Sequence, residues 1–327
     1  MSTGPRLSVV LVATDGAASA KRTMEHLERQ TAREEIELLL IEPEPGELSG
    51  LPLDRYGETF GRFRLVCSHG VRDPDEAIGA GIRGATAPVV ALVEDHAYPE
   101  PEWASALLEA HRGPWVAVGS TLVNANPDRA LSWANLLISY GRWAEPVAGG
   151  EIDVLPGHNV SYKREALLEA CGRRDVASLF GRNGGLHGIL REAGGRFHLE
   201  RQARIQHLNV SRVLSTIRLR YDAGRVYGAF AAREIWSTWE RLKFLVLGPL
   251  VPLVDWMRNV RGLASEDSSH LLRPSILVAL AFAHLLDGFG QMHGNILGAG
   301  RAPERLAAFE ICRPRHVTRT EREELGV

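Results

Sequence analysis

Short apolar runs alternate with helical patterns in the first part of the chain, and this alternation constrains the fold most. Five runs rich in Val, Ile and Leu have the length of buried strands: residues 7–13, 36–41, 63–67, 88–93 and 116–119. Helix-forming residues fill the intervals, and Pro74 and Pro101 stand where helices would begin. Strands and helices in alternation predict an α/β domain with a Rossmann-like, mainly parallel sheet flanked by helices.

Composition limits the classes to which the chain can belong. Its 327 residues, 45 % of them hydrophobic, suffice for one large domain with an extension. A formal net charge of -2 argues against a nucleic-acid partner. Cys67, Cys171 and Cys312 are too few and too far apart for a disulfide framework, so free thiols in a reducing compartment are expected. The first apolar run is too short for a secretory signal, and we expect a cytoplasmic protein.

The character of the sequence changes near residue 215. Helical patterns dominate beyond it, and residues 201–243 hold nine Lys or Arg against three Asp or Glu. An apolar run at residues 244–254, interrupted by two prolines, follows directly. A second apolar helix is expected at residues 275–297, with one polar face made by His284, Asp287 and Gln291. We therefore predict two domains, residues 1–215 and a helical, partly apolar extension at 216–327.

Neither apolar segment is an uninterrupted span of about 20 apolar residues. A basic stretch followed by an apolar one suits a helix that lies on an anionic membrane face, so peripheral association with the inner face of the cell membrane is one expectation. The alternatives are a helical subdomain and a homodimer interface. Gly290, Gly294 and Gly298 are four residues apart and would permit the close approach of another helix, although the last could simply end its own.

Polar and acidic residues follow three of the predicted strands. These residues are Thr14 and Asp15 after the first, Glu42 after the second, and Glu94, Asp95 and His96 after the fourth. The carboxyl ends of parallel strands meet at one edge of the sheet, where α/β proteins bind ligands. We therefore expect these side chains to form one site.

The string ALVEDHAYPEPEW at residues 91–103 leads an apolar strand into two acids and an imidazole, then into a turn with two prolines. It resembles the acidic metal-binding region of glycosyltransferase family 2. Other segments agree in order with that family: residues 8–14 with its first strand and Thr-containing loop, 37–42 with its second strand, 75–84 with the next helix, and 157–165 with a later acceptor-side segment. The resemblance covers roughly residues 7–200 and implies a GT-A fold.

The resemblance also implies a donor site. Sugar transfer from a nucleotide-diphosphate sugar expels a diphosphate, whose charge a divalent metal neutralises. His96 takes the position of the family's metal ligand, with Asp95 beside it, and an imidazole there favours Mn²⁺ over Mg²⁺. The donor would be bound by Thr14, Asp15, Glu42, Glu94 and Asp95, with Glu42 at the nucleotide base.

Three further residues complete the predicted site. His158 and Asn159 match the acceptor-side segment, whose acceptor could be a glycan, a lipid-linked molecule or a small molecule. His207 follows a later β-like stretch. It would either close over the metal or diphosphate, or be an ordinary core histidine.

The chain departs from the family where an acidic general base is expected. Residues 181–186 read GRNGGL, and Asn183 cannot take a proton from an acceptor hydroxyl. Either Asp175 or His187 supplies the base, or the alignment is shifted in this glycine-rich stretch, or transferase activity has been lost. The segment AIGAG at residues 77–81 also lacks the family's basic residue and Asn.

Two functions remain from this sequence, with a third that fits less well. The first is an inverting, metal-assisted glycosyltransferase. The second is a catalytically degenerate GT-A domain that serves as a nucleotide- or glycan-binding partner subunit. A nucleotidyltransferase fits less well, because residues 15–22 offer one glycine and basic residues only at their end.

Overall fold

The apolar runs form the strands of one mixed sheet in the computed structural model, which describes residues 4–42, 44–67, 74–172, 179, 185–263 and 266–327. The strands are β1 (Leu7–Val12), β2 (Ile36–Glu42), β3 (Arg62–Cys67), β4 (Val89–Glu94), β5 (Ala97–Pro99), β6 (Trp115–Asn124), β7 (Gly150–Ile152), β8 (Val160–Lys163) and β9 (Arg196–His207). Their order is β3-β2-β1-β4-β8-β6-β9-β5, with β7 on β9. The five predicted strands are confirmed as β1, β2, β3, β4 and β6.

The pairing changes from parallel to antiparallel across the sheet. β1 pairs in parallel with β2 and β4, and β2 with β3, as predicted. In contrast, β8 runs antiparallel to β4 and β6, and β9 runs antiparallel to β5 and β7. The sequence analysis missed this half, because β5, β7 and β8 are too short to leave an apolar pattern.

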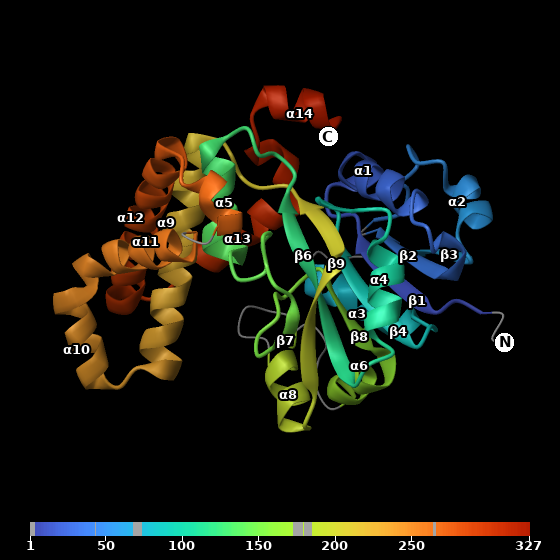
Figure 1. The fold of residues 1–327 in the computed structure, drawn as a ribbon, viewed down its shortest axis with the longest axis horizontal. Helices are drawn as coiled ribbons and strands as arrows, with labels where there is room; N and C mark the ends of the chain where they lie inside the picture. Colours follow the sequence, from blue (N-terminus) through green and yellow to red (C-terminus); the bar gives the residue numbers. More distant parts are fainter. Residues whose placement is uncertain (1–3, 43, 68–73, 173–178, 180–184, 264–265) are drawn as a thin grey trace. The chain divides into compact units, whose positions relative to one another are not determined.

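Two compact units make up the chain. The first comprises Met1–Val123, Val147–His207 and Gly326–Val327, and the second Asn124–Pro146 and Leu208–Leu325. The first unit holds the sheet, with its helices α1 (Gly16–Glu28), α2 (Leu53–Thr59), α3 (Pro74–Gly84), α4 (Trp103–Ala110), α6 (Arg164–Cys171) and α8 (Leu186–Glu192) (Figure 1). The division falls at residue 207, and residues 124–146 join the helical unit rather than the sheet.

Burial of apolar side chains explains the helices on one face of the sheet. Ala77, Ile78 and Ile82 of α3 pack against Val10 and other strand residues in one cluster, which α6 and α8 extend. Gly81 permits this approach, since a Cβ there would lie 2.3 Å from Cγ1 of Val10. The AIGAG segment therefore fits tightly against β1.

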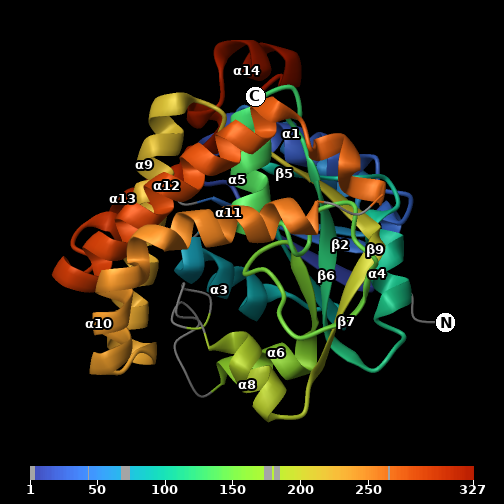
Figure 2. The same ribbon diagram turned by 60° about the vertical axis from the view of Figure 1, so that its left-hand side comes forward.

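Helices make up nearly all of the second unit. They are α5 (Ala130–Tyr140), α9 (Val213–Phe230), the π-helical turn η2 (Ala231–Ile235), α10 (Thr238–Leu247), η3 (Gly248–Leu250), α11 (Val251–Gly262), η4 (Glu266–Leu271), α12 (Pro274–Leu297), α13 (Ala302–Ile311), η5 (Arg313–His316) and α14 (Arg319–Leu325). α12 packs against α9, α5 and α11 (Figure 2). It corresponds to the apolar helix that we predicted at residues 275–297.

Glycines bring the backbones of α9 and α12 into contact. A Cβ added at Gly290 would lie 2.1 Å from the carbonyl oxygen of Tyr221, and one at Gly294 would lie 2.0 Å from that of Arg225. On α9, a Cβ added at Gly228 would lie 2.1 Å from the carbonyl oxygen of Gln291. The predicted close helix approach is confirmed for Gly290 and Gly294, whereas Gly298 has φ +74° and ends α12.

Gly290→Ala is expected to lower the free energy of unfolding by at least about 2 kcal/mol, because the added methyl group cannot fit without moving a backbone. Gly262→Ala is the matched control, since its Cβ would meet nothing within 4 Å. Urea denaturation followed by circular dichroism measures both. Equal stability of the two variants would show that α9 and α12 are not in backbone contact.

Buried neutral histidines should make the fold sensitive to acid. Burial, with smaller contributions from Lys163 and His198, lowers the pKa of His111 to about 3. The unfolded chain binds a proton at this residue below pH 6.5 and the folded chain does not, so stability present at pH 7 is lost as the pH falls. Between pH 6.5 and pH 5 this one residue should lower the free energy of unfolding by about 2 kcal/mol.

Urea denaturation of His111→Gln at pH 7 and pH 5 tests this effect. Glutamine can still donate to Oγ of Ser161, which lies 2.8 Å from Nε2 of His111. On acidification, the free energy of unfolding should fall by about 2 kcal/mol less in the variant than in the wild type. An unchanged loss would mean that His111 is protonated in the folded protein.

Candidate functional site

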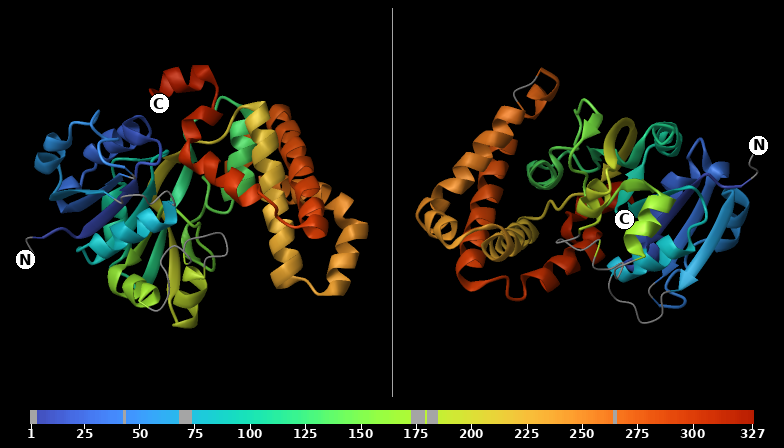
Figure 3. Two further views of the ribbon diagram at one scale, coloured as in Figure 1. Left: turned by 180° about the vertical axis from the view of Figure 1, so that it is seen from behind. Right: turned by 90° about the horizontal axis from the view of Figure 1, so that it is seen from below.

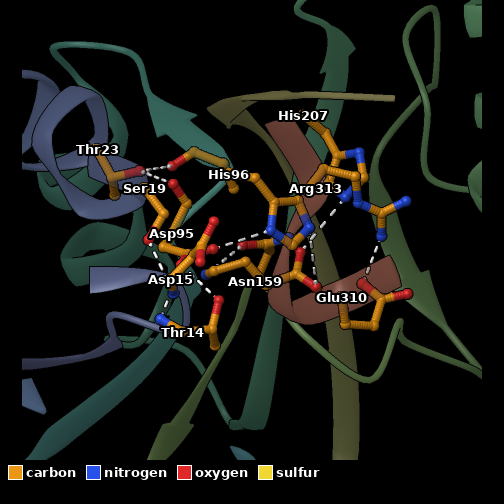
Figure 4. Close-up of polar contacts among 12 residues, drawn as sticks. Thr14, Asp15, Ser19, Thr23, Asp95, His96, Asn159, His207, Glu310 and Arg313 are labelled. Carbon is orange, nitrogen blue, oxygen red and sulfur yellow. Dashed lines mark hydrogen bonds and ion pairs between the residues drawn. The ribbon is translucent and has the colours of Figure 1, made fainter. Parts of the chain in front are cut away.

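The carboxyl ends of β1 and β4 lie side by side, because the two strands pair in parallel up to Glu94. Asp95 and His96 form a turn between β4 and β5, and their side chains point in different directions. Nε2 of His96 faces Oε1 of Glu94 at 3.6 Å, while Asp95 turns toward the end of β1 (Figure 4). Thr23 holds this turn by donating to the carbonyl oxygens of Asp95 and Ala97.

Asp95 links the first strand to the imidazole of His96. Its Oδ2 accepts hydrogen bonds from the backbone nitrogen and Oγ1 of Thr14, at 2.9 and 2.7 Å. Its Oδ1 lies 3.1 Å from Nδ1 of His96 (Figure 4). A carboxylate at this distance favours the tautomer with the proton on Nδ1, which directs the lone pair of Nε2 toward Glu94.

His207 reaches the same place from the other end of the sequence. It is the last residue of β9, and the antiparallel register of β5 and β9 sets it opposite Ala97. Its Nε2 lies 3.4 Å from Oε2 of Glu94, and its ring meets that of His96 edge-on, with 5.2 Å between centroids. Both imidazoles are buried. Glu94, His96 and His207 thus form one cluster, whose ligand atoms all lie within 4.8 Å of one another.

Asn159 fixes the carboxylate of Glu94. Nδ2 of Asn159 donates to Oε2 of Glu94 at 2.6 Å, and the backbone nitrogen of Glu94 donates to Oδ1 of Asn159 at 3.4 Å. Asn159 has φ 59°, a left-handed conformation that Asn adopts more readily than most residues. This unusual conformation, one residue before β8, aims the amide at the end of β4. The structure therefore places Asn159 against the donor-side carboxylate.

The histidines around Glu94 set its charge. Burial by itself would raise the pKa of the Glu94 carboxyl. His96, His158 and His207 outweigh that effect and hold the pKa well below its usual range. Glu94 is therefore a buried carboxylate that stays negative at neutral pH, and such a charge requires positive partners.

The cluster could hold a divalent metal ion. Ligand atoms held about 2.1 Å from one ion lie about 3 to 3.5 Å apart. The separations of 3.4 and 3.6 Å between Glu94 and the two imidazoles are close to that range. One carboxylate and two imidazoles suit Mn²⁺ and its neighbours better than Mg²⁺, which prefers oxygen ligands. Asp95, the other residue that we predicted to bind the metal, is not part of this group and instead contacts Nδ1 of His96.

The remaining residues that we predicted to bind the donor lie at the same edge of the sheet. Asp15 precedes α1, and its backbone nitrogen donates to Oγ of Ser19 at 3.3 Å. Glu42 ends β2 and is buried, with its Oε2 accepting a hydrogen bond from the backbone nitrogen of Gly46 at 3.2 Å. Parallel pairing with β1 brings it to the edge where Thr14 lies. The proposed contact of Glu42 with a nucleotide base stays a prediction.

The structure describes only one of the two predicted bases, His187. Asp175, like Asn183, lies outside the described residues. His187 is in α8, with Nε2 2.9 Å from the hydroxyl of Tyr162. Tyr162 is opposite Val90 in the sheet, four residues before Glu94 and thus about 13 Å along the strand. Burial lowers the pKa of His187 to about 4.

Sequence reasoning missed two parts of this site. It gave Glu94 only a donor contact, whereas the structure places Oε1 of Glu94 3.6 Å from Nε2 of His96. It also missed the pairing of Asn159 with Glu94, for which the only signal is an Asn after His158 in a turn. His207 was named, but only the pairing of β5 with β9 makes it a neighbour of His96.

Comparisons with known proteins bear on the family and the fold of the chain. Residues 8–170 match the family model described as glycosyl transferase family 2. Among solved structures, the chain is similar to the mannosyltransferase PcManGT from Pyrobaculum calidifontis in complex with GDP-Man and Mn²⁺, with a TM-score of 0.52 and 16 % identity over 90 % of this chain and 88 % of that one. At this identity the likeness shows the GT-A fold alone. No curated protein matches the chain significantly.

Asp95→Asn removes only a contact that orients His96 and should weaken Mn²⁺ binding roughly 10- to 100-fold. Glu94→Gln and His207→Ala each remove a ligand and should weaken it at least as much. Isothermal titration with Mn²⁺ on the full chain measures all three. His198→Gln is the control on the same strand, because His198 pairs with Glu200 rather than with the cluster. Wild-type affinity in both His207→Ala and Glu94→Gln would exclude the cluster as the metal site.

Proposed function

We propose that this chain, whose residues 8–170 belong to glycosyltransferase family 2, transfers a sugar from a nucleotide-diphosphate sugar to an acceptor with inversion. The observation that carries the proposal is the convergence of Glu94, His96 and His207 at the carboxyl end of β4. The similar solved structure contains GDP-Man and Mn²⁺, which supports a nucleotide-sugar donor and a metal. The sugar and the acceptor, whether glycan, lipid-linked or small, stay open.

The residues at the edge of the sheet would have different roles in binding the donor. A divalent ion, with Mn²⁺ favoured, would stabilise the negative charge of the departing diphosphate. Asp95 orients His96, and Asn159 holds the carboxylate of Glu94. Thr14, Asp15 and Glu42 would bind the nucleoside part. Because these hydrogen bonds within the protein fix His96 and Glu94, little reorganisation of the two side chains would be needed during transfer.

The acceptor half of the reaction needs a base on the face opposite the leaving group. His187 is a poor candidate, because it is hydrogen-bonded to Tyr162, which lies opposite Val90, four residues before Glu94 and away from the cluster. We therefore assign the base to Asp175. Of the two acceptor-side residues, Asn159 is engaged with Glu94, so His158 would be the one to meet the acceptor.

The alternative is a degenerate domain that binds a nucleotide or glycan for a partner enzyme. Asn183, at the family's usual base position, is the observation that favours it. In that case the metal and nucleotide would still bind, through the cluster of Glu94, His96 and His207 and the residues beside it.

Single-turnover transfer or donor hydrolysis with Mn²⁺ and a panel of nucleotide sugars, beginning with GDP-mannose, tests the assignment. Asp175→Asn should lower kcat by about 10²- to 10⁴-fold, as loss of a general base does, with unchanged KM for the donor. His187→Gln should keep kcat within about threefold of the wild type, since its imidazole lies outside the cluster.

Each other outcome has a definite reading. Nucleotide binding without turnover of any donor would support the binding-subunit alternative. Loss of kcat in His187→Gln, with Asp175→Asn active, would reverse the assignment of the base. His96→Ala with wild-type Mn²⁺ affinity and turnover would remove the metal site from the mechanism.

A further inference from the structure

The polar face of α12 lines a cavity within the helical unit. His284, Asp287 and Gln291 recur at the spacing of one helix face, and all three border a cavity of about 730 Å³. α9 and α11 each present one face to the same cavity, with Arg220 on the first and Asp255 and Asn259 on the second. A volume of this size is typical of a site for a small molecule.

Buried polar groups form part of the cavity wall. Arg220 and His284 are only 4 % and 6 % exposed. Nη2 of Arg220 donates to Oγ of Ser139 at 2.8 Å, and Nε2 of His284 lies 2.8 Å from Nδ2 of Asn259. Such groups are costly to bury, so the cavity is suited to a polar occupant.

The charges of the lining balance one another. Arg220 and Arg258 stand against Asp255 and Asp287, and Nη1 of Arg258 already lies 3.1 Å from Oδ1 of Asp255. Burial raises the pKa of Asp287, against the influence of Arg220. A phosphate would meet two carboxyl groups here, whereas an uncharged molecule with many hydroxyls could use both donors and acceptors. The polar part of the cavity therefore favours a sugar.

Aromatic rings complete the lining. Trp236 and Phe244 approach each other with 4.5 Å between ring centroids, and Tyr227 borders the same cavity. The negative face of an aromatic ring attracts the weakly positive C–H groups on one side of a sugar ring. Aromatic faces beside hydrogen-bonding side chains are the combination that a sugar ring requires.

The outer surface of the same helices is apolar. Of the 19 large apolar side chains exposed in the described parts of the chain, 17 lie between residues 213 and 297. α10 has no buried residue, and its Trp239 and Val246 are 64 % and 77 % exposed. On α12 the exposed side chains Val278, Leu285, Phe289 and Ile296 recur at intervals of seven, four and seven residues. Exposed apolar side chains are therefore concentrated on these helices, whereas on a water-exposed face they are scattered singly.

The helical unit has buried apolar clusters between its helices, such as the one that includes Leu280, yet much of its outer surface is apolar as well. A water-soluble helix bundle instead carries polar side chains on its outer faces. Helices with apolar outer faces lie in the boundary region of a lipid leaflet. Lys243 supports this placement, because its ammonium lies 5.4 Å from the ring centroid of Trp239, as in side chains at a membrane interface. By length and composition α12 could also cross a membrane, a test that core helices pass as well.

We propose that the cavity binds the sugar head group of a membrane glycolipid, whose hydrocarbon chains lie along the exposed apolar side chains of α10, α11 and α12. Figure 3 shows these helices. All residues involved belong to the second unit, so the site does not depend on sugar transfer at Glu94. If the cavity does not bind a glycolipid, the proposed sugar transfer at Glu94 is unaffected.

Dodecyl maltoside below its critical micelle concentration is the probe, with a dodecyl polyoxyethylene ether as the sugar-free molecule of equal chain length. Isothermal titration on the full chain should give an affinity for the maltoside at least about tenfold higher than for the ether. Trp236→Ala and Asp255→Asn should remove that preference, and Trp236→Phe should retain it. Trp239→Ala, on the outer face, should weaken both detergents equally.

Four results would overturn the proposal. Equal affinity for the two detergents in the wild type, or a preference that survives in both folded cavity variants, would exclude a sugar site. Tighter, Trp236-dependent binding of dodecylphosphocholine would assign the cavity to a zwitterionic head group. Binding of maltose as tight as that of dodecyl maltoside would indicate a free glycan rather than a lipid. Thermal melting confirms that each variant is folded.

Discussion

A buried negative charge at Glu94 organises the candidate site. Its carboxylate sits at the end of a central strand, where burial alone would make it neutral. Two imidazoles and the amide of Asn159 surround it, and His96, His158 and His207 hold its pKa well below the usual range. The rest of the site positions these partners: Asp95 holds His96, and the pairing of β5 with β9 delivers His207.

The parallel half of this arrangement could be predicted from the sequence. Long runs of buried residues are the direct mark of central parallel strands, and such runs are enough to place Thr14, Glu42 and Glu94 at one edge of the sheet. The antiparallel half could not be predicted. β5 has three residues and β8 four, and their positions depend on partners far away in sequence. The roles of His207 and Asn159 follow from those pairings, so no local pattern could reveal them.

In the second unit, the spacing of glycines in the sequence predicted a contact between helices. The interval of four between Gly290 and Gly294 correctly indicated backbone contact with another helix. That contact also shapes the cavity, because Gly224 and Gly228 of α9 lie against the carbonyl oxygens of Asp287 and Gln291. Close helix packing thus fixes the polar face of α12 beside Arg220. Which helix would supply the contact could not be known, since nothing in the sequence pairs the glycines of α9 with those of α12.

The central claim is that Glu94, His96 and His207 bind one divalent ion together. Pulsed electron paramagnetic resonance of Mn²⁺ bound to the full chain tests it most directly, because imidazole nitrogens couple to the electron spin of the metal. The account predicts coupling to two histidine nitrogens in the wild type and to one in His207→Ala. Bound Mn²⁺ with no nitrogen coupling, or coupling unchanged in His207→Ala, would contradict it.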